Sequence, residues 1–175
     1  NGAKIYKTTL DTVRGKYSLI MFQHSFEHII NQFNALQHVN RLLDTDGICI
    51  VNMPTVSSYA WRTFRENWVQ LDAPRHLYIH SISSIRLLAE KVGLTLEKVV
   101  YNSWSFQFWG SLQYKNDIPL FSEKSYCVNP KMSIFSNYEI TNFKKKAKNL
   151  NLNSEGDCAA FYLRKKHYPT KIKTS

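Results

Sequence analysis

Tyr17-Ser-Leu-Ile-Met-Phe22 and Ile48-Cys-Ile-Val51 are the two stretches that decide the predicted fold. Short, nearly continuous apolar runs of this kind are typical of strands buried on both faces in a parallel sheet. Between them, four apolar residues recur at helical spacing: Phe33, Leu36, Val39 and Leu43. Asp46-Gly47 supplies turn chemistry and predicts the end of that helix. Strand, helix, turn and strand in this order predict a βαβ unit with parallel strands and a right-handed crossover.

The sequence after this unit predicts two more helices and two more strands. A helix is expected to start after Ser81, a typical N-cap, and to end at Gly93. Residues 94–101 alternate between apolar and polar side chains, as a strand does. Residues 138–150 predict a basic helix, and residues 156–164 predict a last strand.

Two long insertions, residues 55–80 and 102–137, interrupt these elements. The first is rich in Trp, Tyr, His and Arg and has no clean periodicity, so we expect a functional excursion. The second begins with a dense aromatic group: Trp104, Phe106, Phe108 and Trp109. This group either covers an apolar or planar ligand or, as we favour, forms a lid that packs on the sheet. A weaker strand signal covers Lys4–Lys7.

Composition excludes several classes of protein. The chain has 175 residues, 43% of them hydrophobic, which is typical of one globular domain rather than a disordered chain. The sequence shows neither a signal peptide nor an apolar run long enough for a membrane span, so we expect a cytoplasmic protein without membrane partners. Its three cysteines are odd in number and far apart, so we expect free thiols and no metal site.

Positive charge gathers in residues 142–175, which hold nine Lys and Arg and two acidic residues, a contribution of +7 to the net charge of +10. A basic patch can bind nucleic acid. We favour a solvated helix face followed by a flexible basic tail over residues 168–175, because charge runs are usually exposed. The basic run also lacks the interleaved aromatic residues that a stacking platform uses, so a nucleic-acid partner is not expected.

Two runs, YSLIMFQHSFEHI (residues 17–29) and ALQHVNRLLDTDGICIVNMP (residues 35–54), resemble the fourth and fifth strands of class I S-adenosylmethionine-dependent methyltransferases. In that family a strand leads into a loop that often ends in Glu-His, followed by a helix with Leu-Leu, a charged residue before Gly, and a strand ending near Pro. The corresponding features here are Glu27-His28, Leu42-Leu43, Asp46-Gly47 and Ile48–Pro54. Residues 71–99 resemble a family branch in which an inserted substrate segment ends in His before a Ser-capped helix, and GDCAAFYL resembles the closing strand.

The resemblance implies an α/β fold: the C-terminal part of a Rossmann-like sheet, mostly parallel with an antiparallel last strand, and helices on both faces. Two features depart from the family. Ser18 stands where Asp is usual, and the chain has neither a Gly-rich loop nor the acidic residue that would hold the ribose. The simplest interpretation is a truncated domain over residues 1–167, inactive alone. Its first clear strand would then expose an apolar edge, which predicts self-association or a rearranged segment covering that edge.

The resemblance also implies where a cofactor, S-adenosylmethionine, would lie. Ligands of open α/β sheets bind beyond the carboxyl ends of the strands. Gln23, His24 and Ser25 end the first strand and would lie near the methionine part of the cofactor. Thr9 and Leu10 would lie near the adenine.

The residues for methyl transfer are expected in the excursion, residues 55–80. His76 is the candidate base because a neutral imidazole is available near pH 7, and Asp72 would orient its ring. Four further residues are candidate contacts for a small-molecule acceptor: Trp68, Arg75, Tyr78 and His80. An alternative is that Asp72, Arg75 and His76 form a structural hydrogen-bond knot. Two other functions stay open, a nucleic-acid-binding or nucleic-acid-methylating module and a non-catalytic assembly domain.

Overall fold

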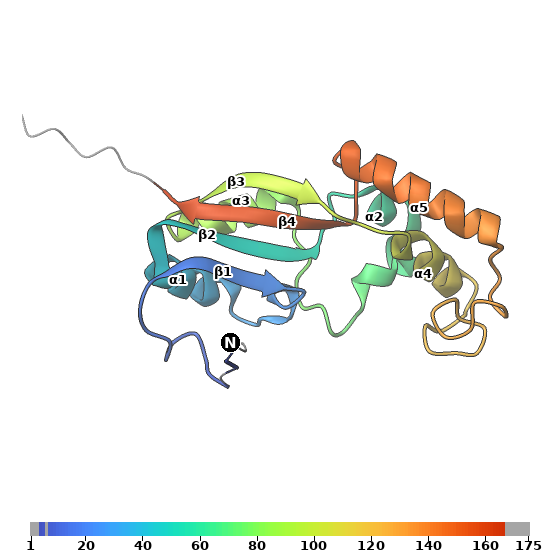
Figure 1. The fold of residues 1–175 in the computed structure, drawn as a ribbon, viewed down its shortest axis with the longest axis horizontal. Helices are drawn as coiled ribbons and strands as arrows, with labels where there is room; N and C mark the ends of the chain where they lie inside the picture. The colour runs from blue at the N-terminus through green and yellow to red at the C-terminus, as the bar shows by residue number, and fades with distance from the viewer. Residues whose placement is uncertain (1–3, 6, 167–175) are drawn as a thin grey trace, which may run out of the picture.

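The structure, a computed structural model, describes residues 4, 5 and 7–166, and its centre is a four-stranded mixed sheet (Figure 1). The strands are β1 (Tyr17–Gln23), β2 (Leu43–Pro54), β3 (Leu94–Tyr101) and β4 (Cys158–Lys165), in the order β1-β2-β4-β3. β1 and β2 are parallel, and β4 pairs antiparallel with both β2 and β3. The expected α/β fold with an antiparallel last strand is confirmed.

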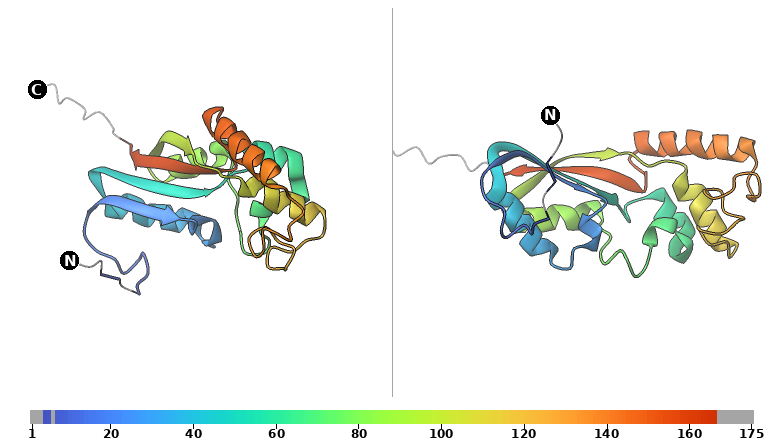
Figure 2. Two further views of the ribbon diagram at one scale, coloured as in Figure 1. Left: turned by 45° about the vertical axis from the view of Figure 1, so that its right-hand side comes forward. Right: turned by 60° about the horizontal axis from the view of Figure 1, so that its bottom comes forward.

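Two helices, α1 (Gln32–Leu42) and α3 (Ile82–Lys91), cover the same face of this sheet, as the right-hand view of Figure 2 shows. Side chains of both helices join one core with the inward side chains of the strands, among them Phe22, Val51 and Phe161. The expectation of helices on both faces is therefore wrong for the described residues. On the opposite face, the apolar side chains of β1 are about half exposed.

A second group of helices lies beyond the carboxyl ends of the parallel strands (Figure 1). It contains α2 (Tyr59–Phe64), α4 (Phe106–Lys115) and α5 (Asn137–Leu152). The 3-10 turns η2 (Arg65–Asn67) and η3 (Val69–Leu71) follow α2 in sequence and contact α4. We call this group the helical lobe. Its small core has buried residues from α4 and α5, namely Phe108, Ala147 and Leu150, with three aromatic rings packed around them: Tyr59, Phe64 and Phe143. The aromatic lid therefore packs within the lobe, whereas we expected it to pack on the sheet.

Two details of the βαβ unit correct the expectations. Phe33 is 41% exposed, and the buried face of α1 passes through Ala35, Leu36 and Val39 to Leu42. The turn predicted at Asp46-Gly47 lies within β2. The pairing of β1 with β2 has a register shift there, because Tyr17 pairs with Leu43 and Leu19 pairs with Ile48. A Cβ on Gly47 would lie 2.8 Å from the Tyr17 carbonyl oxygen, so the close approach of the two strands explains the glycine.

The predicted helix starts and stops are confirmed where local chemistry determines them. Ser81 caps α3 in a reciprocal capping box with Ser84, and Gly93 follows this helix with φ of 77°. Ser136 and Glu139 form the same arrangement at the start of α5. The strand over residues 156–164 is confirmed as β4.

Other expectations have mixed outcomes. Residues 4, 5 and 7 adopt no strand, contrary to the weak signal over Lys4–Lys7, and the basic tail over residues 168–175 lies outside the described residues. All three cysteines are free thiols: Cys49 and Cys158 are buried, and Cys127 is exposed.

Within the described part of the chain, no helix is both long and apolar enough to cross a membrane.

Candidate functional site

The carboxyl ends of β1, β2 and β3 carry polar side chains that meet at one edge of the sheet. His24, directly after β1, has a left-handed backbone with φ of 45°, and its N–H donates to the Asn52 carbonyl oxygen at 2.9 Å. The Asn52 amide lies 3.4 Å from His24 Nε2, and its side-chain oxygen accepts a hydrogen bond from Asn102 at 2.9 Å. The Cys158 thiol lies 3.7 Å from the same oxygen. These contacts join four strand ends into one polar cluster.

Asn52, Asn102 and Cys158 were not predicted as site residues. The signal that could have found them is their position, since each stands at a strand end or within two residues of one. Burial raises the pKa of the Cys158 thiol to about 12, which keeps it protonated and suits a hydrogen-bond donor rather than a nucleophile.

Glu27 lies beside this cluster, in the 3-10 turn η1 (Phe26–His28) that follows β1. Its side chain is 1% exposed, and neither carboxylate oxygen has a hydrogen-bond partner among the described residues. The nearest basic atoms are His24 Nδ1 at 3.7 Å and His76 Nε2 at 3.9 Å. Both distances exceed those of charge-assisted hydrogen bonds, so Glu27 is a buried carboxylate that protein atoms do not satisfy.

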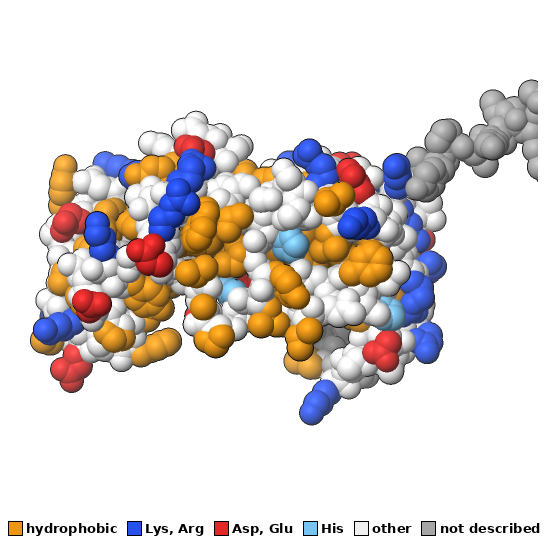
Figure 3. All heavy atoms as spheres, turned by 180° about the vertical axis from the view of Figure 1, so that it is seen from behind, with side chains coloured by type: hydrophobic (Ala, Val, Ile, Leu, Met, Phe, Trp, Pro, Cys, Tyr) orange, Lys and Arg blue, Asp and Glu red, His pale blue; other side chains and the backbone are white. Residues whose placement is uncertain are grey.

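The excursion, residues 55–80, folds back onto η1. The backbone N–H groups of Leu77 and Tyr78 both donate to the Glu27 carbonyl oxygen, at 3.0 and 3.3 Å. His28 Nδ1 lies 2.7 Å from the Arg75 carbonyl oxygen, so this nitrogen donates, and the neutral ring then has its lone pair on Nε2. Arg75 and Tyr78, two of the predicted acceptor contacts, are exposed beside this junction. Figure 3 shows histidine side chains, in pale blue, at the surface of this face of the molecule.

The predicted base and its predicted orienting partner are close together but are not hydrogen-bonded. His76 Nε2 lies 3.8 Å from Asp72 Oδ2, and the Asp72 carboxylate is instead paired with the Arg75 guanidinium. The ring is oriented by its Nδ1–H, which donates to the Gln70 carbonyl oxygen at 2.7 Å. His76 is 7% exposed, so its free Nε2 faces Glu27 and Asp72 rather than solvent.

Two other predicted contact residues hold the fold together. Trp68 is fully buried, and its indole N–H donates to Asp157 Oδ2 at 3.0 Å. His80 Nε2 lies 2.7 Å from the side-chain oxygen of Gln32, and its Nδ1 lies 2.9 Å from the Ser84 hydroxyl. Burial lowers the pKa of His80, which favours its neutral form. Neither side chain presents a free polar group to a ligand in this conformation.

The predicted cofactor residues fall into two separate places. Gln23, His24 and Ser25 are exposed at the end of β1. Thr9 and Leu10 line a groove of about 530 Å³ beside the start of α1. The other residues that line this groove are Thr8, Asp11, Ile29, Asn31, Asn34, Ala35 and His38. The groove lining includes none of residues 23–25, so the structure does not bring the two sets together.

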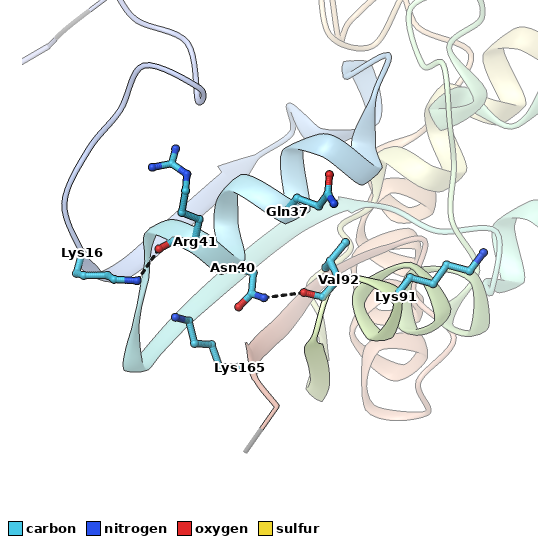
Figure 4. Close-up of a pocket in the computed structure, with 7 residues that line it drawn as sticks. All are labelled: Lys16, Gln37, Asn40, Arg41, Lys91, Val92 and Lys165. Carbon is cyan, nitrogen blue, oxygen red and sulfur yellow. Dashed lines mark hydrogen bonds between the residues drawn. The ribbon is translucent and has the colours of Figure 1, made fainter. Parts of the chain in front are cut away.

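A hollow of similar size lies at the opposite end of the sheet, near the start of β1 (Figure 4). Its lining includes four cationic side chains: Lys16, Arg41, Lys91 and Lys165. Lys16 and Arg41 already donate hydrogen bonds to backbone carbonyl oxygens, and Arg41 holds the segment before β1 through Leu10 and Val13. Because it is remote from the carboxyl strand ends, we do not assign the functional site to it.

Comparison with known protein families shows to which family the chain belongs. A family model described as a methyltransferase domain matches residues 4–99, more than half of the chain. The chain belongs to the class I S-adenosylmethionine-dependent methyltransferases. The family implies S-adenosylmethionine as the cofactor. Comparison with curated proteins gave no match.

Solved methyltransferases share the fold at low sequence identity. The chain is similar to an S-adenosylmethionine-dependent methyltransferase, possibly acting on histamine according to its description, from Thermotoga maritima, with 14% identity, a TM-score of 0.53 and coverage of 92% of this chain and 63% of that one. It is also similar to an O-methyltransferase of a polyketide synthase from Brevibacillus brevis, solved with S-adenosylhomocysteine, with 14% identity, a TM-score of 0.50 and coverage of 94% and 50%. The chain thus spans between a half and two thirds of these two methyltransferases.

The end of β1 is where the resemblance to the family led us to expect the methionine part of the cofactor, and the exposed side chains of Gln23, His24 and Ser25 offer hydrogen-bonding groups there. No glycine of the described residues forms a cradle: Gly47, Gly110 and Gly156 would each place a Cβ within 3 Å of protein atoms, Gly15 faces open space and Gly93 ends α3. The described part of the chain therefore lacks the backbone loop that the adenosine side requires in this family.

Proposed function

We propose that this methyltransferase domain supplies the acceptor side of a site for methyl transfer to a small molecule, and that the isolated 175 residues do not form a complete cofactor site. One observation carries the proposal: the excursion is hydrogen-bonded to η1 at the carboxyl end of β1. Leu77 and Tyr78 both donate to the Glu27 carbonyl oxygen there. Since ligands of open α/β sheets bind at this edge, the excursion lies where an acceptor would meet the methyl group.

The chain's own residues would position and deprotonate an acceptor. Methyl transfer is an in-line displacement, so its rate depends on holding the nucleophile against the methyl group. His24, whose side chain is 46% exposed, and the exposed Tyr78 offer polar groups at the strand end. His76 is the candidate base, and its Nε2 lies 3.9 Å from Glu27 and 3.8 Å from Asp72. S-adenosylmethionine, when bound, supplies the electrophilic methyl group. A base is needed where the acceptor is a hydroxyl.

One observation favours a second candidate, methylation of nucleic acid. Trp104 is 60% exposed and lines a hollow of about 270 Å³ with Lys144 and Lys148. An exposed ring beside two cations is suited to stacking a base next to its phosphate. The neighbouring Lys146 is engaged differently, because its ammonium donates to the Tyr59 hydroxyl and lies over the Tyr59 and Phe108 rings. We rank this candidate second because the hollow is lined by residues 103–105 and by α5, and by no residue of the excursion.

The test uses a form of the protein that binds S-adenosylmethionine, with a radiolabelled methyl group and two acceptor pools, small hydroxyl and amine compounds and single-stranded oligonucleotides. We expect label in the small-molecule pool, and we expect Tyr78→Ala to reduce it while Trp104→Ala does not. Label only in the oligonucleotides, reduced by Trp104→Ala and by added salt, would contradict the proposal and support the second candidate.

A further inference from the structure

Three side chains beside the strand ends form a set of potential metal ligands, of which the proposed function uses only His76. Glu27, His28 and His76 each offer one ligand atom, and these atoms all lie within 4.8 Å of one another. They come from two segments about fifty residues apart, η1 and the returning end of the excursion. The contacts of Leu77 and Tyr78 with the Glu27 carbonyl oxygen bring the segments together. We propose that Glu27, His28 and His76 bind a divalent transition-metal ion of the zinc class.

The orientation of the two imidazoles supports this site. His28 Nδ1 lies 2.7 Å from the Arg75 carbonyl oxygen, and His76 Nδ1 lies 2.7 Å from the Gln70 carbonyl oxygen. A carbonyl oxygen only accepts, so both rings donate from Nδ1, and the neutral imidazole with this tautomer has its lone pair on Nε2. Metal-binding histidines are characteristically held by such a backbone carbonyl on the other nitrogen, which fixes the tautomer and the ring orientation. The two ring centroids lie 4.9 Å apart.

Glu27 provides the second, independent observation. Its carboxylate is almost completely buried and has no hydrogen-bond partner among the described residues. A buried carboxylate needs a compensating charge or hydrogen bonds, because desolvation strongly disfavours the unpaired ion. An imidazolium at His24 or His76 would be the alternative partner. His24 Nδ1 lies 3.7 Å and His76 Nε2 3.9 Å from Glu27 Oε1, and both distances are too long for a charge-assisted hydrogen bond. An ion bound between the Glu27 carboxylate and His76 Nε2 would give each of these groups a partner.

The ligand chemistry selects the ion. Two imidazoles and one carboxylate suit zinc, cobalt or iron, whereas calcium and magnesium favour oxygen ligands alone. Two ligands about 2.1 Å from one zinc ion lie roughly 3.4 Å apart in a tetrahedron, so the three side chains must close by around an ångström. Three protein ligands leave one position open. This role rests on the proposed function: an acceptor hydroxyl bound at that position would have its pKa lowered by the ion.

The test measures metal binding in the absence of cofactor and acceptor, so that its failure leaves the proposed methyl transfer untouched. The 175-residue chain, carrying Cys127→Ser to remove an exposed thiol, is stripped with chelator and titrated with Co²⁺, followed by visible absorption and by competition with Zn²⁺. We expect one equivalent to bind. Glu27→Gln should weaken binding by more than the roughly 10–100-fold that loss of an outer-shell partner causes.

His38→Gln is the matched control, because this imidazole lies on α1 outside the ligand set, and it should leave the affinity unchanged. His28→Gln is a second variant at an exposed position, which keeps the test informative where Glu27→Gln does not fold. Absence of stoichiometric Co²⁺ binding by the unaltered ligand set would overturn the proposal. Equal affinity of the chain and of the folded Glu27 or His28 variants would also overturn it, because the ion would then be bound adventitiously elsewhere.

Discussion

The indole N–H of Trp68 donates to Oδ2 of Asp157 at 3.0 Å, between two fully enclosed side chains that are 89 residues apart in sequence. This bond joins the excursion to the residue that precedes β4. The backbone strengthens the same junction, because the Thr55 N–H donates to the Asp157 carbonyl oxygen at 2.9 Å. The helical lobe is thereby anchored to the sheet at the edge that carries the candidate site.

Trp68→Phe tests this anchor. The variant keeps most of the ring but removes the donor, so Asp157 loses a partner inside the protein. We expect the free energy of unfolding, measured with urea, to fall by about 1–3 kcal/mol, the usual cost of a buried group left unpaired. Trp104→Phe, at an exposed position, is the control and should change it by less than about 0.5 kcal/mol. Equal effects of the two changes would show that the hydrogen bond contributes nothing.

Asp157 also predicts a pH dependence of stability. Burial raises the pKa of its carboxyl from 3.8 to about 6, although the Trp68 hydrogen bond opposes the shift. Between these two values the folded state holds the proton more firmly than the unfolded state, so this residue's contribution to stability is complete below pH 4 and is lost as the pH rises through 6. The difference of about two pH units corresponds to roughly 3 kcal/mol at most.

Asp157→Asn isolates that contribution, since an amide oxygen still accepts from Trp68 but does not ionise. We expect the variant to gain stability relative to the parent chain as the pH rises from 4 to 7, when both are unfolded with urea at each pH. A difference between the two proteins that does not change over this range would mean that Asp157 titrates normally.

The sequence predicted those elements whose signals are local. The strands β1, β3 and β4 follow from apolar runs or alternation, and α3 follows from Ser81 and Gly93. The helices α2 and α4 were missed because their aromatic residues face one another across the helical lobe, and this contact leaves no simple period in either segment. Trp68 was interpreted as a ligand contact because its partner, Asp157, lies too far along the chain to be associated with it from the sequence.

The candidate site was predicted only in part. Position after a strand drew attention to His24, whose neighbour in the polar cluster is Asn52. Asn52 was overlooked because a polar residue inside an apolar strand has no distinctive local signal. Asp72 was assigned to His76 from a spacing of four residues. The Asp72 carboxylate instead pairs with the nearby Arg75. The His76 ring is oriented by the backbone carbonyl of Gln70, and no side-chain pattern in the sequence reveals such a contact.

His76→Ala tests the catalytic role proposed for the excursion. In a metal-free form of the enzyme that binds S-adenosylmethionine, where no ion occupies His76 Nε2, we expect turnover to fall by roughly 10²–10⁴-fold, the usual cost of losing a general base. Cofactor affinity should stay near that of the parent, because the ring lies on the acceptor side. Asp72→Asn is the matched control and should affect turnover little. Near-normal turnover of His76→Ala with the true acceptor would remove this residue from the mechanism.

The free edge of β1 predicts self-association of the isolated chain. Among the described residues β1 pairs only with β2, and its outer face carries Leu19 and Met21, which are 49% and 53% exposed. An unpaired apolar edge of this kind favours pairing with a second copy. We expect sedimentation velocity to show concentration-dependent dimers, weakened in a Leu19→Lys, Met21→Lys double variant. A strictly monomeric parent chain at high concentration would refute this prediction.

Calorimetric titration of the 175-residue chain with S-adenosylmethionine tests the central claim most directly. The claim is that these residues form the acceptor side of a methyltransferase site and lack the loop that holds the adenosine side. Hydrogen bonds to charged groups contribute about 1.5–3 kcal/mol each, so the loss of several should weaken binding by orders of magnitude. We expect no binding in the micromolar range. Micromolar binding by this chain would contradict the claim, because the described residues would then hold the cofactor in a way that the family pattern does not provide.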